Sequence, residues 1–309
     1  MKILIISGFL GAGKTTFIQE LVKRTHREIA VLENEYGAEG LDKSILENGL
    51  TAGDVNIWEL TEGCICCSTK GDFAASVLTI ANAVDPAFLV VEPTGVGMPS
   101  NIIRNLRQIE YERITLLSPV TVVDGNSFGR YMEEYPELYR DQIQTASTIL
   151  ISKMEQADES ERETLKAELQ KWNPEAEIVA KHYTLMPDSW WKRLLENGFG
   201  KESTEEKDMG TLPDSFSLSR IHMDSVERLI ILLENLIRGV YGDIVRAKGC
   251  VEICGQTVLF DVADGRYSII GAESEMTGRA VFIGRMIYRQ MLRKELFKKA
   301  EKRIVRKNK

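Results

Sequence analysis

The chain has few of the features that mark secreted, membrane-spanning or nucleic-acid-binding proteins. Its five cysteines are a low, odd number for 309 residues, which argues against a secreted disulfide framework. No run of eighteen or more apolar residues occurs, so no segment is predicted to span a membrane. Basic residues do not outnumber acidic ones, 39 against 46, which argues against nucleic acid as the main partner. We therefore predict a cytoplasmic protein without internal repeats.

Two further scarcities concern the N-terminus and histidine. The opening MKILIISGFL lacks a small-residue cleavage site and runs into a glycine loop, so it fits a buried first strand better than a signal peptide. The three histidines, His26, His182 and His222, are widely separated. Each is interpreted as a surface or packing residue and not as a metal ligand.

What the first part of the chain does contain is an alternation of short apolar runs with helical patterns. This alternation predicts right-handed βαβ units and a mainly parallel sheet flanked by helices. The predicted strands cover residues 2–7, 29–33, 55–60, 87–92, 114–124, 148–152 and 176–180. The predicted helices cover residues 15–24, 73–84, 99–109 and 161–172. The fold class is α/β.

The alternation breaks after Tyr183, and we expect three parts: a first domain at 1–185, a linker at 186–212 and a smaller α+β domain at 213–309. Prolines, glycines and the run KESTEEKD favour the linker, although WWKRLLENG is also compatible with a short helix packed on the body. The second domain has predicted strands at 215–223, 244–253, 257–262, 267–270 and 280–287 and helices at 226–237 and 289–300. Nine of the last seventeen residues are basic, which we interpret as a solvated helix face and tail.

The strongest motif is GFLGAGKT at residues 8–15. It fits the phosphate-binding pattern G-x-x-x-x-G-K-[ST], follows an apolar strand and opens a helix, which is the context that the motif requires. Glycines bring backbone N–H groups close to phosphate oxygens, and the helix N-terminus adds partial positive charge. Lys14 is predicted to bridge the β- and γ-phosphates, and the Thr15 hydroxyl to ligate Mg²⁺. The predicted nucleotide-binding residues here are Gly8, Gly11, Ala12, Gly13, Lys14, Thr15 and Thr16.

Two later segments complete a nucleoside-triphosphatase. In FLVVEPTG, Glu92 ends a buried strand and is the predicted acid for Mg²⁺, while Gly95 stands where a glycine senses the γ-phosphate. The predicted catalytic residues are thus Lys14, Glu92 and Gly95. In TILISKMEQAD, Ser152, Lys153 and Glu155 occupy the place of the guanine-reading [NT]-K-x-D motif. Ser152 and Glu155 depart from that pattern, but the carboxylate is kept, so GTP is favoured over ATP.

The segment TEGCICCS at residues 61–68 holds Cys64, Cys66 and Cys67. A turn after Gly63 would gather the three thiolates around one ion, with a fourth position left for Glu35, Glu39, water or a client ligand. Sulfur donors suit Zn²⁺, Co²⁺ or Cu⁺ better than Mg²⁺. A redox pair and a purely structural turn remain as alternatives.

The other two cysteines lie in the second domain. Cys250 and Cys254 are spaced along a predicted strand. Their spacing places them on one side of it, so both are interpreted as core residues.

The segments GFLGAGKTT, ENEYG, ELTEGCICCS, EPTG, VVDG and SKME, in that order, resemble the CobW family of P-loop GTPases, in the same class as HypB and UreG. The second domain resembles the family's C-terminal domain, with its R-x-K-G signature at Arg246, Lys248 and Gly249. The resemblance implies Zn²⁺ or Co²⁺ at the cysteines, and GTP binding and hydrolysis coupled to the delivery of a metal or cofactor. Metal is thereby favoured over the other two interpretations of the cysteines.

Three features depart from the family pattern. The base motif is altered, as described above. Ala38 follows Gly37, so the acid that many members carry next comes one place later, at Glu39. The chain also lacks the histidine-rich tract of many members, which argues against metal storage.

The first hypothesis is therefore a GTPase metallochaperone or cofactor-insertion factor for a client metalloprotein or corrinoid protein. It would use GTP, Mg²⁺ and Zn²⁺ or Co²⁺, and hydrolyse slowly alone because the sequence assigns no arginine finger. The alternative is a nucleotide-dependent binding switch with structural cysteines. A small-molecule kinase is a third reading, in which the cysteines have no role. The metal, the client and a nucleotide- or metal-dependent dimer are left open.

Overall fold

The computed structural model describes residues 1–33, 55–59, 70–110, 113–200, 214–263, 265–272 and 278–297. The chain divides into two compact units, Met1–Leu212 and Pro213–Lys309. Each unit has its own sheet and its own hydrophobic core.

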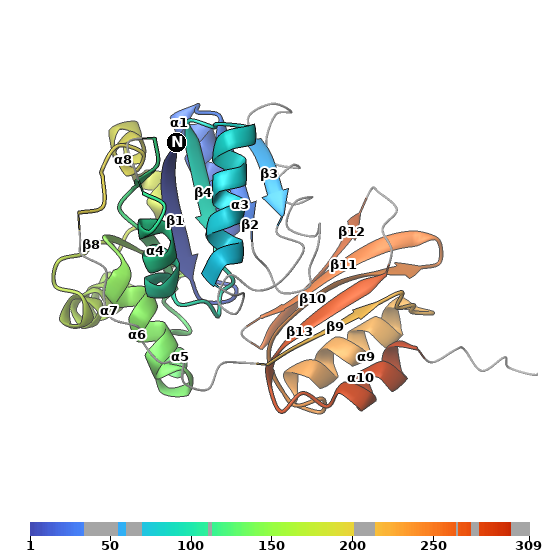
Figure 1. The fold of residues 1–309 in the computed structure, drawn as a ribbon. Coiled ribbons are helices and arrows are strands. Elements are labelled where there is room, and N and C mark those ends of the chain that lie inside the picture. The colour runs from blue at the N-terminus through green and yellow to red at the C-terminus, as the bar shows by residue number, and fades with distance from the viewer. Residues whose placement is uncertain are drawn as a thin grey trace, which may run out of the picture. The chain divides into compact units, whose positions relative to one another are not determined.

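The first unit is built on a parallel sheet (Figure 1). Its described strands are β1 (Lys2–Gly8), β2 (Ile29–Glu33), β3 (Val55–Glu59), β4 (Phe88–Glu92), β5 (Thr115–Leu116), β6 (Val120–Asp124), β7 (Thr148–Ser152) and β8 (Glu177–Val179). They are ordered β3-β2-β4-β1-β6-β7-β8, with β5 also paired to β1. Every pairing between these strands is parallel, which confirms the predicted fold class.

Helices connect these strands. The described ones are α1 (Lys14–Thr25), α3 (Lys70–Ala83), α4 (Pro99–Arg107), α5 (Phe128–Glu134), α6 (Pro136–Thr145), α7 (Glu159–Trp172), α8 (Asp188–Leu194) and the 3₁₀ turn η1 (Tyr183–Leu185). The predicted helices are all present, and α7 begins at a capping box between Asp158 and Glu161. The pair α5 and α6 was not predicted. The proline at the start of α6, Pro136, suits a first helical position.

The central strand β1 shows how the two faces of the sheet are covered. Successive strand residues point to opposite faces. Leu4 and Ile6 pack in one core cluster with residues of α1 and α8. Ile3 and Ile5 pack in another with residues of α3 and α4. Because both faces are buried, the strand reads as a continuous apolar run, and the P-loop at its end rests on a rigid element.

The predicted linker at 186–212 is wrong in its first part. Residues 188–194 form α8, whose Trp190 and Trp191 are buried. The Trp191 ring stacks on Phe17 of α1, with ring centroids 5.2 Å apart. Burial of two large aromatic side chains outweighs the conformational entropy that the segment loses on ordering. This stretch therefore belongs to the first unit and forms the short helix that the sequence offered as the alternative to a linker.

The second unit contains an antiparallel sheet with helices on one face (Figure 1). Its elements are β9 (Asp214–Ser219), α9 (Val226–Ile237), β10 (Asp243–Ile253), β11 (Gln256–Ala263), β12 (Arg266–Ala272), β13 (Arg279–Arg285) and α10 (Arg289–Leu296). The strand order is β12-β11-β10-β13-β9. Leucines of α9 and α10 pack with Ala247, Val251 and Phe282 of the sheet. This is the α+β arrangement that the sequence predicted.

The expectation that Cys250 and Cys254 are both core residues is half right. Cys250 is buried in β10, but Cys254 is exposed. The strand ends at Ile253, and Cys254 and Gly255 form the two-residue connection to β11, with φ of 51° and 79°. Two positive φ values match the twist that joins neighbouring antiparallel strands, so the turn, not the core, fixes the place of Cys254.

Across the described ranges, no helix has the length and apolar character needed to cross a bilayer.

At the start of the basic C-terminal stretch, the Arg293 guanidinium lies 5.3 Å from the ring centre of Phe216. This arginine therefore packs within the second unit.

Candidate functional site

The loop between β1 and α1 has the geometry of a phosphate cradle. Its three glycines, Gly8, Gly11 and Gly13, have φ of 142°, 78° and 98°, values that glycine adopts without steric cost. A Cβ at Gly8 would lie 2.3 Å from the carbonyl oxygen of Val122 on β6, so glycine is also needed there for packing. Gly13 is the N-cap of α1. The first N–H groups of that helix therefore face the loop, where they favour an anion.

Three charged or polar side chains meet beside this loop. Lys14 Nζ lies 3.8 Å from Glu92 Oε1 and donates to the Phe9 carbonyl oxygen at 3.4 Å. The Thr15 hydroxyl donates to the two Glu92 carboxylate oxygens at 3.4 and 3.5 Å. Both Lys14 and Glu92 are largely buried, with 7% and 13% of their side chains exposed. A parallel sheet produces this meeting, because the carboxyl ends of β1 and β4 lie at the same edge.

The oxygens of Thr15 and Glu92 fit a magnesium ion. Octahedral Mg²⁺ holds its ligands at about 2.1 Å, which puts neighbouring ligand oxygens about 3 Å apart. The Thr15 hydroxyl and the Glu92 carboxylate are 3.4 Å apart. Carboxylate and hydroxyl oxygens are also the donor types that this ion prefers.

Gly95 lies directly against the P-loop. A Cβ at this position would come within 2.6 Å of the Leu10 backbone nitrogen and 2.8 Å of its Cα. Gly95 itself is buried. The loop after β4 therefore passes the P-loop at backbone contact, at the place that the sequence assigned to a γ-phosphate sensor.

The segment after β7 is tied to the P-loop. Ser152 is buried, and its hydroxyl donates to the Ala12 carbonyl oxygen at 2.8 Å. Lys153, with φ of 60°, places its Nζ 2.8 Å from the Asp124 carboxylate at the end of β6. In this structure Ser152 supports the P-loop, which the base motif alone did not indicate, and Asp124 is a neighbour that the motif did not include.

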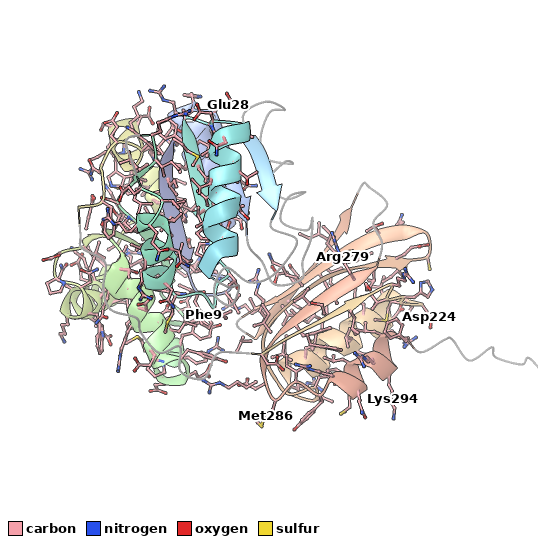
Figure 2. The ribbon with its side chains drawn as sticks, in the orientation of Figure 1. Phe9, Glu28, Asp224, Arg279, Met286 and Lys294 are labelled. Atoms are coloured by element: carbon pink, nitrogen blue, oxygen red, sulfur yellow. The ribbon has the colours of Figure 1, made fainter. Side chains whose placement is uncertain are left out.

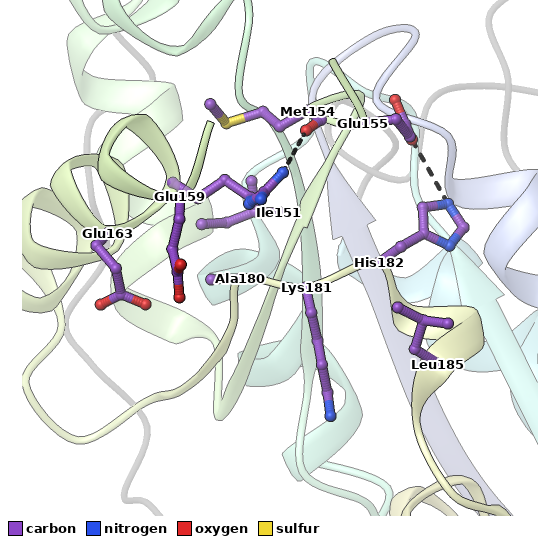
Figure 3. Close-up of a pocket in the computed structure, with 10 residues that line it drawn as sticks. Ile151, Met154, Glu155, Glu159, Glu163, Ala180, Lys181, His182 and Leu185 are labelled. Atoms are coloured by element: carbon purple, nitrogen blue, oxygen red, sulfur yellow. Dashed lines mark hydrogen bonds and ion pairs between the residues drawn. The ribbon is translucent and has the colours of Figure 1, made fainter. Parts of the chain in front are cut away.

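Glu155 lines a pocket of about 410 Å³ together with residues that follow β8 (Figure 3). His182 Nε2 lies 3.5 Å from Glu155 Oε1, the pair drawn on the right of that view. The His182 ring stacks on Tyr183, with centroids 4.6 Å apart. Burial raises the pKa of Tyr183, and the negative charges of Glu20 and Glu155 raise it further. The contact between Glu155 and the loop after β8 was not predicted from the sequence.

The predicted residues meet a support on α6 that sequence reasoning missed. Gln142 Nε2 donates to the carbonyl oxygens of Gly95 and Gly97 at 3.0 and 3.2 Å. Phe9, which Figure 2 labels at the end of β1, packs on Tyr131 with ring centroids 4.1 Å apart. No motif marks Gln142 on α6 or Tyr131 on α5. The sequence signal for their helices was the apolar and aromatic spacing of FGRYMEEYPELYRDQI, residues 128–143, which resembles any amphipathic helix.

The predicted metal ligands cannot be placed in this way. Cys64, Cys66, Cys67, Glu35 and Glu39 lie outside the described residues. Among the residues that are described, no group of three histidine, cysteine, aspartate or glutamate side chains forms a metal cluster. The described strand ends do show that Glu33 of β2 pairs with Glu59 of β3 and with Glu92 of β4. The strands β2 and β3, which precede the segments that carry the two glutamates and the three cysteines, thus end on the same edge of the sheet as Glu92.

Fold and site together define a P-loop nucleoside-triphosphatase: a glycine loop and lysine at the start of α1, and a carboxylate beside a threonine hydroxyl. Residues 2–180 match the family described as CobW/HypB/UreG, nucleotide-binding domain. Residues 214–299 match the cobalamin synthesis protein cobW C-terminal domain. The chain belongs to the CobW/HypB/UreG family.

Several characterised relatives are similar to this chain. The zinc chaperone YjiA of Escherichia coli is 28% identical over 292 residues, which cover 87% of each chain. The zinc chaperone YeiR of Escherichia coli is 32% identical over 173 residues, 54% of this chain and 50% of that protein. The zinc-regulated GTPase metalloprotein activator 1 of Dictyostelium discoideum is 25% identical, over 81% of this chain and 62% of its own length. The chain thus spans about half to nearly all of these relatives.

A solved structure also resembles this one. The Zn(II)-bound YjiA GTPase from E. coli aligns over 96% of this chain and 99% of its own, with 21% sequence identity and a TM-score of 0.47.

Proposed function

We propose that this protein is a GTP-hydrolysing metallochaperone. It binds a thiophilic divalent metal ion and uses the nucleotide state to control delivery of that ion, or of a metal-containing cofactor, to a client metalloprotein or corrinoid protein. The observation that carries the nucleotide half is the meeting of Glu92 with Lys14 and Thr15 beside the glycine loop. The metal half is supported by the three clustered cysteines and by relatives that are named zinc chaperones.

Each residue has a defined task in nucleotide hydrolysis. The N–H groups from Gly8 to Thr16 and the Lys14 ammonium hold the β- and γ-phosphates. Thr15 and Glu92 hold Mg²⁺, which when bound neutralises charge on the phosphate oxygens. Gly95, at backbone contact with Leu10, offers its N–H to the γ-phosphate. Hydrolysis is slow in the protein alone, and the client completes the site.

The base is guanine in this proposal. Glu155 offers a carboxylate, which accepts from two neighbouring N–H groups of guanine and finds no such pair on adenine. Lys153 is fixed by Asp124 at 2.8 Å and provides an alkyl surface for the base. The test is competition: GTP, and not ATP, displaces a fluorescent GDP analogue at micromolar concentration. Equal displacement by both would contradict the assignment of Glu155.

The metal site uses Cys64, Cys66 and Cys67, with Glu35 or Glu39 or a client ligand in the fourth position. Three thiolates form a donor set suited to Zn²⁺ or Co²⁺. Coupling to nucleotide is supported by the strand ends, because Glu33 and Glu59 are registered with each other and Glu33 with Glu92. In this proposal a change of nucleotide alters the segments that follow both strands, as in other nucleotide-dependent switches.

The decisive experiment is a Co²⁺ titration of metal-free, reduced protein with and without Mg·GTP. We expect an intense thiolate-to-cobalt band that nucleotide shifts. The band is lost in Cys66→Ala and retained in Cys254→Ala, a control that removes an exposed thiol of the second unit. If the wild-type protein shows no band, the metal role is wrong. GTP hydrolysis that persists in such a protein would then favour the nucleotide-dependent switch with structural cysteines.

A further inference from the structure

The loop that carries Gly95 is held from one side by a buried amide. Gln142 on α6 is 1% exposed, and its Nε2 donates to the carbonyl oxygens of Gly95 and Gly97. Carbonyl oxygens only accept hydrogen bonds, so this contact requires the amide nitrogen. One side chain thereby fixes two peptide groups of the loop on either side of Val96.

The far end of the same loop is held by the preceding residue of α6. Asp141 is fully buried, and its Oδ2 accepts from the Ser100 backbone N–H at 3.1 Å. Ser100 is in the first turn of α4, which begins at Pro99. A carboxylate at a helix N-terminus is stabilised by the unpaired N–H groups and the helix dipole. The loop after β4 is therefore attached to α6 at both of its ends.

The support is itself anchored to the P-loop strand. The Thr121 hydroxyl of β6 donates to the Gln142 carbonyl oxygen at 2.8 Å. Ser7, the residue before Gly8, lies 2.7 Å from the same hydroxyl, and since Thr121 has one proton to give, Ser7 is the donor to it. Asn173 Nδ2 donates to the carbonyl oxygens of Ile143 and Ala146 at the end of α6, each at 2.8 Å. A continuous hydrogen-bonded path thus joins β1 to Gly95 through α6.

We propose that Gln142 is a positioning residue for GTP hydrolysis: it keeps Gly95 against the P-loop so that the Gly95 N–H meets the γ-phosphate, and Asp141 sets the far end of that loop. Gln142 acts through Gly95 and Gly97 and does not touch the nucleotide. The inference rests on the proposed function, because it requires that the P-loop binds and hydrolyses GTP. The γ-phosphate is present in GTP and absent in GDP, so a contact to it affects only GTP.

The test compares Gln142→Met with Gln144→Met. Methionine keeps the length of glutamine and removes the amide donor. Gln144 lies on the exposed side of the same helix, which makes it a matched control. We measure the affinities for a fluorescent GDP and for a non-hydrolysable GTP analogue, and kcat and KM for GTP. The amide makes two hydrogen bonds, so we expect Gln142→Met to weaken the GTP analogue and lower kcat by about 10- to 100-fold.

GDP binding discriminates positioning from general support. In Gln142→Met the GDP affinity stays within about threefold of wild type, because the P-loop contacts are unchanged. A merely structural role would weaken both nucleotides alike and lower the melting temperature, and that result overturns the proposal. If Gln142→Met does not fold, Gln142→Leu, which is apolar and also lacks a hydrogen-bond donor, is judged by the same ratio of affinities.

The two proposals fail in different ways. A wild-type protein that neither binds GTP nor hydrolyses it overturns the proposed function. A wild-type protein that does both, combined with an equal ratio of GTP-analogue to GDP affinity in Gln142→Met and Gln144→Met, overturns only the role of Gln142.

Discussion

Gly95 lies at close backbone contact with the P-loop, and Gly95→Ala tests this contact. The added Cβ would lie 2.6 Å from the Leu10 nitrogen and 2.8 Å from Leu10 Cα and Cδ2, whereas ordinary contact begins near 3.4 Å. Backbone atoms cannot rotate away as a side chain does, so one of the two loops must withdraw by nearly an ångström. Such overpacking costs about 1–3 kcal/mol.

The functional consequence follows from where the withdrawal occurs. A displacement of about 1 Å in a reacting geometry costs up to about 100-fold in rate. We therefore expect kcat for GTP to fall about 10- to 100-fold in Gly95→Ala. The GDP affinity changes less than about threefold if the loop after β4 yields, and more if the P-loop yields. Steady-state hydrolysis and fluorescent GDP binding measure the two effects separately.

The control for this prediction is Gly129→Ala in α5. A Cβ there meets nothing within 4 Å, and alanine is the better helix former by up to about 1 kcal/mol. This variant should hydrolyse GTP like wild type and melt at the same or a higher temperature. If Gly95→Ala behaved like Gly129→Ala in both assays, the claim that Gly95 senses the γ-phosphate by contact with the P-loop would be refuted.

Three other expectations concern charge, packing and pH. Glu92→Gln removes the negative charge opposite Lys14 and one candidate Mg²⁺ ligand. We expect kcat to fall by about 100-fold and the Mg²⁺ concentration that gives the half-maximal rate to rise. An unchanged Mg²⁺ titration would contradict this. Trp191→Ala removes a fully buried indole stacked on Phe17 and should lower the free energy of unfolding of the first unit by about 3–5 kcal/mol in urea, whereas a loss below 1 kcal/mol would show that the helix α8 is dispensable. The pKa of Tyr183 is raised above its ordinary 10.0, so the folded state favours the neutral phenol. The stability that this group contributes is complete below pH 10 and is lost as the pH rises through the folded pKa. The melting temperature of Tyr183→Phe should therefore fall less steeply with pH above 10 than that of the wild type, and equal slopes would exclude this cause.

Local patterns predicted most of the elements, because their causes are local. Apolar runs between turn signals identified the described strands, although the run predicted as one strand at 114–124 forms two, β5 and β6. The capping box at Asp158 and Glu161 marks the start of α7. The P-loop was recognised from GFLGAGKT because glycine spacing, a lysine and a helix start are all written in consecutive residues. Two failures had different causes. Trp190 and Trp191 are buried against residues that are distant in the sequence, whereas Cys254 and Gly255 form a local turn that the strand prediction overlooked.

The segment from Ser152 to Glu155 shows how a motif can be recognised without its contacts. Ser152 ends β7, and Lys153 and Glu155 follow it. Their partners come from elsewhere: Ala12 for Ser152, Asp124 for Lys153 and His182 for Glu155. None of these pairs is separated by fewer than 27 residues, so no local pattern connects them.

The sequence by itself determined the class of the protein, the order of most of its strands and helices and the position of the phosphate loop, because each depends on residue types at short, fixed spacing. Tertiary structure alone decided that Gly95 touches Leu10 and that Gln142 holds the loop after β4. It also set the distances of Glu92 to Lys14 and Thr15. The physical reason is the parallel sheet: it brings the ends of β1 and β4 to one edge, and only packing determines which helix lies close enough to fix the distance.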